Sequence, residues 1–295
     1  MLLGSPPDMV RSAPSHRTRP FAHSNTQTHI FVNTFYHISC IFTIAKHKML
    51  KKIHNADIIA VYNRKMKGVS FLEGITVKEL FSLPDCPASL LLSRVTYPFE
   101  ALALISGFIK ETGPTLDPDI YEYKGDFIWV AKSAVIAPSA NIAGPCIIGE
   151  RTEVRHCAFI RGSALVGNDC VVGNSTELKN VILIESVQVP HYNYVGDSVL
   201  GSHSHMGAGA ITSNVKSDKT LVVIKSGNER IETGRKKVGA VLGDYVEVGC
   251  GSVLNPGTVI GKNTNIYPLS SVRGVIPENS ILKNSGEVVT KRNEC

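Results

Sequence analysis

Two polar segments carry the side chains best suited to chemistry. They are PHYNYVGD (residues 190–197) and HMGAGAITSN (residues 205–214). An unperturbed imidazole has a pKa of about 6.5, so it is mostly uncharged at neutral pH and can accept a proton, which makes the imidazole of His191 a candidate base. Upstream, Arg161 and Lys179 stand 18 residues apart. An arginine offers a bidentate fork and a lysine a point charge, and both bind phosphate.

A repeat of six residues must position these groups. Every sixth residue from 130 to 184 is aliphatic, which fits neither the helical nor the strand period. The ten positions are Val130, Ile136, Ile142, Ile148, Val154, Ile160, Val166, Val172, Leu178 and Ile184. A small residue follows four places later in eight of the ten cases, and the register returns from Leu242 to Val272. The spacing predicts a hexapeptide-repeat solenoid.

The repeat predicts a prism with three short parallel strands per coil, the aliphatic residues inside and the small ones at the corners. Arg161 and Lys179 each follow an aliphatic position, so they point outward from neighbouring coils about 5 Å apart. Two stacked cations repel one another, which favours an anion between them, although the nearby Glu177 could also neutralise one of the two. The register breaks after Ile184, at Pro190, and again over residues 215–241, where the pattern indicates a β-hairpin or loop.

The motifs resemble the acetyltransferase domain of the bifunctional N-acetylglucosamine-1-phosphate uridyltransferase/glucosamine-1-phosphate acetyltransferase family. That family carries His-x-x-Tyr-x-Gly-Asp and Gly-Ala-Gly-x-Ile-Thr-x-Asn segments, and both are matched here. FIRGSALVG and STELKN resemble its arginine- and lysine-bearing coils. The resemblance covers about residues 127–288 and implies an all-β fold, a left-handed parallel β-helix, behind short N-terminal helices and a disordered extension.

The resemblance implies a role for each matched residue. His191 would be the general base that takes a proton from a sugar amine as the amine attacks the acetyl-CoA thioester. The implied sugar-phosphate ligands are Arg161, Lys179, Tyr194 and Asn214. Ala208 would lie against acetyl-CoA. Three positions depart from the family pattern: His205 replaces an asparagine that contacts the sugar, and Cys250 and Pro268 replace serine and alanine along the cofactor groove.

The implied activity is an acetyl-CoA-dependent N-acetyltransferase acting on an amino sugar 1-phosphate, with glucosamine 1-phosphate as the expected acceptor. Its relatives imply a homotrimer with sites between subunits and no metal. Before residue 127 no glycine cluster resembles a nucleotide loop, so we expect no uridyltransferase activity from this chain. The stretch after Asn214 is shortened, which leaves open whether Lys216 or Lys219 reaches the phosphate.

Two other functions remain open. The γ-type carbonic anhydrases resemble this chain in architecture and bind zinc through three histidines between subunits. Here His156, His191, His203 and His205 do not have their spacing. The other alternative is a non-catalytic trimeric solenoid that scaffolds or regulates a separate nucleotidyltransferase.

Composition limits the remaining classes. The chain has 295 residues and a net charge of +6, but residues 1–65 hold nine basic and two acidic residues. The remainder is nearly neutral, which argues against a nucleic-acid-binding face. Seven cysteines without a regular framework favour reduced thiols in the cytoplasm. The longest apolar stretch, residues 30–45, is shorter than the roughly 20 residues of a membrane span.

The organisation expected along the chain has four parts. Residues 1–65 are a disordered extension or an upstream translation start, and residues 66–126 are a small helical segment and polar connector. Within this segment we expect a short helix over residues 76–83 and a second from Pro98 to Gly113. Residues 127–288 are the β-helix, and residues 289–295 are a tail.

Overall fold

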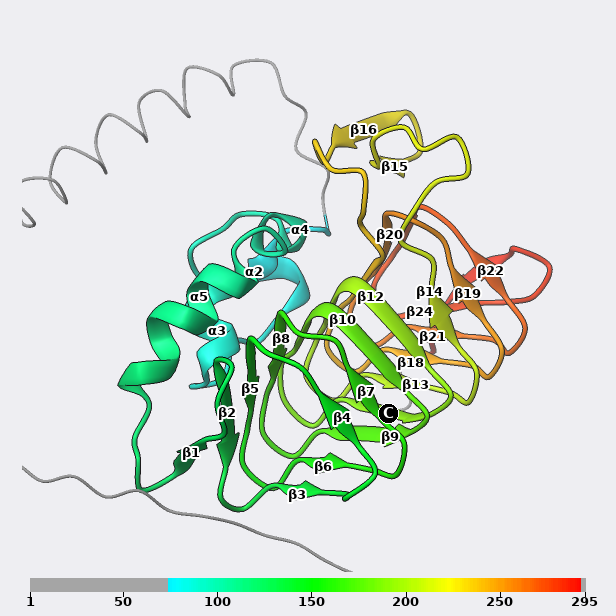
Figure 1. Cartoon of the computed structure of the whole chain (residues 1–295). Coiled ribbons are helices and arrows are strands. Elements are labelled where there is room, and N and C mark those ends of the chain that lie inside the picture. The colour runs from blue at the N-terminus through cyan, green and yellow to red at the C-terminus, as the bar shows by residue number, and fades with distance from the viewer. Residues whose placement is uncertain (1–73, 293–295) are drawn as a thin grey trace, which may run out of the picture. The chain divides into compact units, whose positions relative to one another are not determined.

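A computed structural model describes residues 74–292, which lie in one compact unit (Figure 1). A parallel β-helix occupies most of this region, preceded by short helices. The predicted fold class, an all-β left-handed parallel β-helix, is confirmed. The predicted extension over residues 1–65 lies outside the described residues. No helix within residues 74–292 has the length and apolarity needed to cross a bilayer.

The coil has three faces. The first holds β2 (Ile128–Ala131), β5 (Cys146–Ile148), β8 (Ala164–Val166), β17 (Ala240–Leu242), β20 (Thr258–Ile260) and β23 (Val275–Ile276). The second holds β3 (Val135–Ile136), β6 (Glu153–Val154), β9 (Val171–Asn174), β11 (Gln188–His191), β13 (His205–Met206), β18 (Glu247–Val248), β21 (Asn265–Ile266) and β24 (Ser280–Leu282). The third holds β4 (Asn141–Ile142), β7 (Phe159–Ile160), β14 (Ile211–Thr212), β19 (Val253–Leu254) and β22 (Ser271–Val272). The longer strands β10 (Glu177–Leu183) and β12 (Tyr194–Leu200) pair with strands of both the third and the first face.

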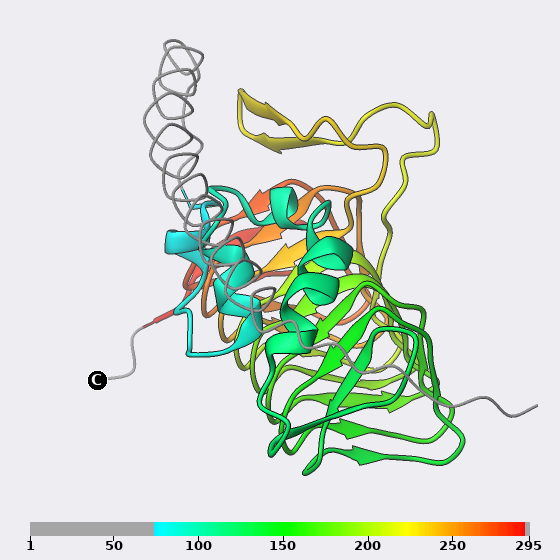
Figure 2. The same ribbon diagram turned by 60° about the vertical axis from the view of Figure 1, so that its left-hand side comes forward.

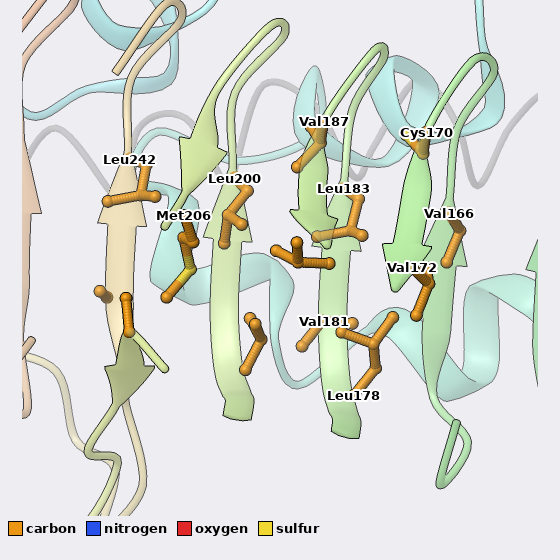
Figure 3. Packing of buried hydrophobic residues seen from close by; sticks show 14 of the residues in the cluster. Val166, Cys170, Val172, Leu178, Val181, Leu183, Val187, Leu200, Met206 and Leu242 are labelled. Atoms are coloured by element: carbon orange, nitrogen blue, oxygen red, sulfur yellow. The ribbon is translucent and has the colours of Figure 1, made fainter. Parts of the chain in front are cut away.

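The interior of the coil is filled by the aliphatic residues of the repeat. Figure 3 shows Val166, Leu183, Leu200 and Leu242 at corresponding positions of neighbouring strands. The last three are fully buried. Each such side chain contributes about 1.5–3 kcal/mol when it leaves water, so the stack stabilises the solenoid along its length.

The register prediction was wrong at Ile184. Leu183 faces the interior and pairs with Val166, whereas Ile184 packs in the hydrophobic cluster outside the coil, beneath the helices. The shift occurs earlier than predicted, between Leu178 and Leu183, because β10 turns a corner without leaving the sheet. Asn180 takes a positive φ of 55° at this corner. The coil from Val166 to its partner Leu183 therefore has 17 residues, one fewer than the coil from Ile160 to Leu178.

Short helices cover the first face. They are α2 (Val77–Leu80), α3 (Pro87–Leu92), α4 (Pro98–Ala101) and α5 (Ile105–Thr112), followed by a 3-10 turn over Gly113–Thr115. Figures 1 and 2 show the helices beside the coil. The helices and the insert share one hydrophobic cluster with the buried, outward-facing Ile147, Leu165, Ile182, Val199, Val241 and Val259. The helix predicted over residues 76–83 is shorter than expected, and α3 was not predicted. Thr76 and Glu79 form a capping box at the start of α2.

The predicted single helix from Pro98 is divided in two. The chain turns between α4 and α5, and Leu104, expected on the buried face, is 44% exposed. Gly113 ends α5 for a reason that the sequence pattern did not indicate. A Cβ atom there would lie 2.4 Å from the ring of Trp129, so only glycine allows the helix to end against that side chain.

Antiparallel strands flank the coil and form the insert. β1 (Tyr121–Tyr123) pairs with β2 inside the expected polar connector, and β25 (Val288–Thr290) pairs with β24. Between β14 and β17, β15 (Val223–Ser226) and β16 (Glu229–Glu232) form the hairpin indicated by the sequence. It stands out from the coil in Figure 2.

Candidate active site

One edge of the solenoid brings together four residues that the resemblance assigned to the base and the cofactor groove. They are His191, Ala208, Cys250 and Pro268, and all four are exposed. Backbone hydrogen bonds of 2.9–3.0 Å connect them in order. The N–H of Gly209 donates to the carbonyl oxygen of His191, that of Gly251 to Ala208, and that of Leu269 to Cys250. The four residues therefore occupy successive rungs of one column. We call this the corner column.

Backbone contacts fix His191 at the end of β11. Its N–H donates to Oδ1 of Asn193 at 3.1 Å. The Asn193 side chain is buried and donates in turn to the carbonyl oxygens of Gly207 and Ala210. Within residues 74–292 no side chain or backbone group forms a hydrogen bond to the imidazole. The turn is held rigidly while the ring of His191 stays exposed.

A buried carboxylate organises the residues that follow the turn. Asp197 is 2% exposed and accepts hydrogen bonds from three side chains. Lys179 Nζ lies 3.0 and 2.9 Å from its two oxygens, Asn180 Nδ2 lies at 2.9 Å and Asn214 Nδ2 at 2.6 Å. Because the carboxylate is shared, it fixes Lys179 and Asn214 relative to one another. We call Asp197 and these three partners the Asp197 cluster.

Sequence reasoning gave Asp197 no role, although the residue closes the His-x-x-Tyr-x-Gly-Asp segment. The signal that could have found it is the coil spacing. Lys179 pairs in register with Gly196, so a carboxylate one residue further lies beside the lysine.

Tyr194 joins the Asp197 cluster through Asn214, whose Nδ2 lies 3.3 Å from the phenol oxygen. Burial raises the pKa of Tyr194 above its ordinary value, so the phenol stays protonated at neutral pH. Gly196 makes this arrangement possible, since a Cβ atom there would lie 2.6 Å from the Tyr194 hydroxyl. The glycine of the motif therefore leaves room for the phenol.

Arg161 lies one rung before Lys179, as predicted, but its charge is already compensated. Its Nη1 donates to Oε1 of Glu177 at 2.7 Å, and this hydrogen bond raises the pKa of the guanidinium. Lys179 has Asp197. Each cation therefore has its own carboxylate, so repulsion between the two cations no longer favours a bound anion.

His205 is the one predicted sugar ligand on another face. It lies in β13 on the second face, and its Nδ1 is 2.9 Å from Oε2 of Glu247. Lys179 and Tyr194 belong to strands of the third face. Within one chain the structure does not bring His205 to Tyr194 and Asn214.

Lys216 and Lys219 follow Asn214 in the shortened stretch. Lys216 Nζ donates to Thr220 Oγ1 and lies 3.2 Å from Asp218. The ring of His203 stacks on Tyr245 with centroids 4.8 Å apart. Across residues 74–292 no group of three or more His, Cys, Asp or Glu side chains could hold a metal ion.

The fold and these positions define a hexapeptide-repeat solenoid with a polar site along one edge. Residues 142–264 match the family described as the GMPPB C-terminal domain. The bifunctional sugar-1-phosphate nucleotidylyltransferase/acetyltransferase of Sulfurisphaera tokodaii is 37% identical over 87 residues, which are 30% of this chain and 22% of that protein. The bifunctional protein GlmU of Methanococcus maripaludis is 34% identical over 112 residues, which are 38% of this chain and 27% of that protein.

The matched regions thus span about a quarter of these curated relatives. A solved structure of a putative acetyltransferase from Bacillus cereus covers 57% of this chain and 80% of its own, with 18% identity and a TM-score of 0.33. The acetyltransferase domain of PglB from Neisseria gonorrhoeae, solved with acetyl coenzyme A, covers 70% and 80%, with 15% identity and a TM-score of 0.29. The solenoid is related in sequence to GlmU-like proteins, as its motifs predicted.

Proposed function

We propose that the solenoid is an acetyl-CoA-dependent N-acetyltransferase acting on an amino sugar 1-phosphate, with glucosamine 1-phosphate as the expected acceptor. One observation carries the proposal: the exposed imidazole of His191 stands at the first rung of the corner column, three residues before Tyr194 and six before Asp197. The names of the curated relatives, which include acetyltransferase activity, support it. The product would serve nucleotide-sugar synthesis in the cytoplasm.

The reaction needs a proton acceptor beside the amine. The amine nitrogen attacks the thioester carbonyl carbon and forms a C–N bond. The C–S bond breaks, and coenzyme A leaves as its thiolate. The imidazole of His191 accepts the proton that the amine loses. Arg161 and Lys179 bind the phosphate, while Tyr194 and Asn214 orient the sugar.

The corner column would hold the co-substrate. Ala208 has a minimal side chain, so acetyl-CoA can approach the backbone closely, and Cys250 and Pro268 continue the same edge. We propose a homotrimer in which a neighbouring chain closes this edge, and in which His205 contacts the sugar bound to that neighbour. Residues 127–288 would then form the catalytic domain.

Thiol labelling tests the place of the co-substrate. Burial raises the pKa of Cys146 and Cys170 to about 12, so these thiols should not be alkylated in the folded protein. Cys157 and Cys250 are exposed and should react. Saturating acetyl-CoA should slow alkylation of Cys250 at least about tenfold, measured by peptide mass spectrometry. Cys157 lies on the same edge but four rungs from the residue that follows Cys250, so it is the internal control. Equal protection of both thiols would remove Cys250 from the groove.

Replacing Arg161 by alanine tests the phosphate contact. Because hydrogen bonds to charged groups contribute about 1.5–3 kcal/mol, the KM for the amino sugar 1-phosphate should rise roughly 10- to 150-fold with little change in kcat. Steady-state kinetics with varied acceptor measures the effect. Arg155→Ala is the matched control, since Arg155 also pairs with a glutamate, Glu153, on another face. An unchanged KM in Arg161→Ala would argue against phosphate binding there.

A further inference from the structure

A polar cavity lies where the inserted hairpin meets the solenoid. It measures about 260 Å³ and is lined by alternate residues of the hairpin, including Lys225, Arg230 and Glu232, and by Arg273 of the coil. The intervening hairpin residues Ile224 and Ile231 are buried in the outer hydrophobic cluster. One side of the hairpin therefore packs, and the other presents charge to the cavity.

Four cations line this cavity, and three of them lack a carboxylate partner among the described residues; the fourth, Lys216, pairs with Asp218. Lys225 and Arg230 are direct cross-strand neighbours, an arrangement that destabilises an antiparallel pair. Among the described residues neither forms an ion pair, and Arg273 contacts only the neutral Asn255, at 2.8 Å. Glu232 is the one carboxylate in the lining. An anion bound between the cations would relieve their repulsion.

The hairpin is held closely against the coil. A Cβ atom at Gly274, where φ is +82°, would lie 3.0 Å from the carbonyl oxygen of Lys225. A Cβ atom at Gly257 would lie 2.9 Å from a methyl group of Val222. Glycine at these two corners allows the hairpin strands to approach the coil closely. This close approach fixes the hairpin cations relative to Arg273.

We propose that this cavity binds a phosphate or diphosphate group, held by Lys225, Arg230 and Arg273. Guanidinium forks suit such anions. The volume is below the roughly 300–1,000 Å³ of pockets for whole drug-sized ligands, so the cavity fits one anionic group of a larger molecule. The group belongs either to the co-substrate, coenzyme A, or to a separate nucleoside diphosphate.

The three unpaired cations of this site lie further along the coil than Lys179, although Lys216, two residues after Asn214, also lines the cavity. The pairing of successive coils places Arg273 at the same coil position as Lys179, four rungs further along. At the usual strand spacing, four rungs correspond to about 19 Å. The proposed acetyl transfer uses none of the three cations, so this site goes beyond that function.

Calorimetric titration of the full chain tests the proposal, with inorganic pyrophosphate, coenzyme A and uridine diphosphate as separate probes. The double variant Lys225→Gln/Arg230→Gln should bind at least one probe ten or more times more weakly than the unmodified protein. The affinity of the unmodified protein should fall as salt rises. The matched control is Lys236→Gln/Lys237→Gln, which removes the same charge from exposed insert residues outside the cavity lining.

Two further readouts identify the source of the phosphate and verify folding. A higher KM for acetyl-CoA with unchanged kcat in the double variant would assign the group to coenzyme A. Weakened binding of pyrophosphate or uridine diphosphate with unchanged KM would assign it to a separate ligand. The Tm without ligand should not fall, because a like-charge pair has been removed. Equal affinities of variant and unmodified protein for all three probes, or no measurable binding by the unmodified protein, would overturn the proposal even if acetyl transfer were also absent.

Discussion

Replacing His191 by alanine should lower kcat roughly 10²- to 10⁴-fold, because the amine would lose its proton acceptor. The imidazole is exposed and the turn is held through the backbone and Asn193, so the substitution should leave the fold intact. Release of free thiol from acetyl-CoA, measured at saturating acceptor, gives kcat directly. The far-ultraviolet circular dichroism and the Tm should match those of the unmodified protein.

His156→Ala is the matched control for this change. His156 lies two rungs before His191 at the same corner, as the contacts through Asn174 show. Its ring contacts Ser139, away from the Asp197 cluster. Its loss should leave kcat within about twofold, since a general base contributes only at the reacting amine. Turnover by His191→Ala at the unmodified rate would remove His191 from the mechanism.

Asp197→Ala should lower the free energy of unfolding by about 3–5 kcal/mol, because it leaves the charge of Lys179 and two side-chain amides without their shared acceptor. Urea denaturation measures this loss. Asp197→Asn retains one acceptor oxygen and should lose less. Both variants should also bind the amino sugar 1-phosphate more weakly, since Lys179 and Asn214 lose their common anchor.

Asp169→Ala controls for the backbone. Both aspartates have a positive φ, 49° at Asp197 and 55° at Asp169, so alanine is strained equally at the two positions. Asp169, however, pairs with Arg151 in solvent, an arrangement that contributes about 0–1 kcal/mol. Equal destabilisation by the two variants would show that left-handed backbone strain, rather than the buried carboxylate, determines the effect.

The solenoid was predictable because its interior admits one kind of side chain at one spacing. The register shift in β10 was not predictable from the sequence. Leu183 and Ile184 are both aliphatic, so the pattern does not show that Leu183 faces the interior while Ile184 packs outside the coil. The break between α4 and α5 was also not predictable, because the residues around it continue the helical spacing of apolar residues. Leu104 fits a helical stripe, but the turn before α5 leaves it exposed.

The family resemblance, rather than the coil spacing, named His191, Ala208, Cys250 and Pro268, which the structure aligns in the corner column. Compensation of charge was predicted only in part. Glu177 was expected to be able to neutralise one cation and pairs with Arg161, whereas the pairing of Asp197 with Lys179 was not predicted. The second-face position of His205 could not be predicted, because motif order along the chain does not indicate which face of the prism a residue occupies.

The most direct measurement of the proposed activity is thiol release by the purified full chain, with acetyl-CoA and a panel of amino sugars, each with and without a 1-phosphate. We expect release that depends on the amine and is far faster with the 1-phosphate than with the free sugar. Release no faster than in protein-free buffer with every sugar, from folded protein that still binds acetyl-CoA, would contradict the proposed activity and favour a scaffolding role.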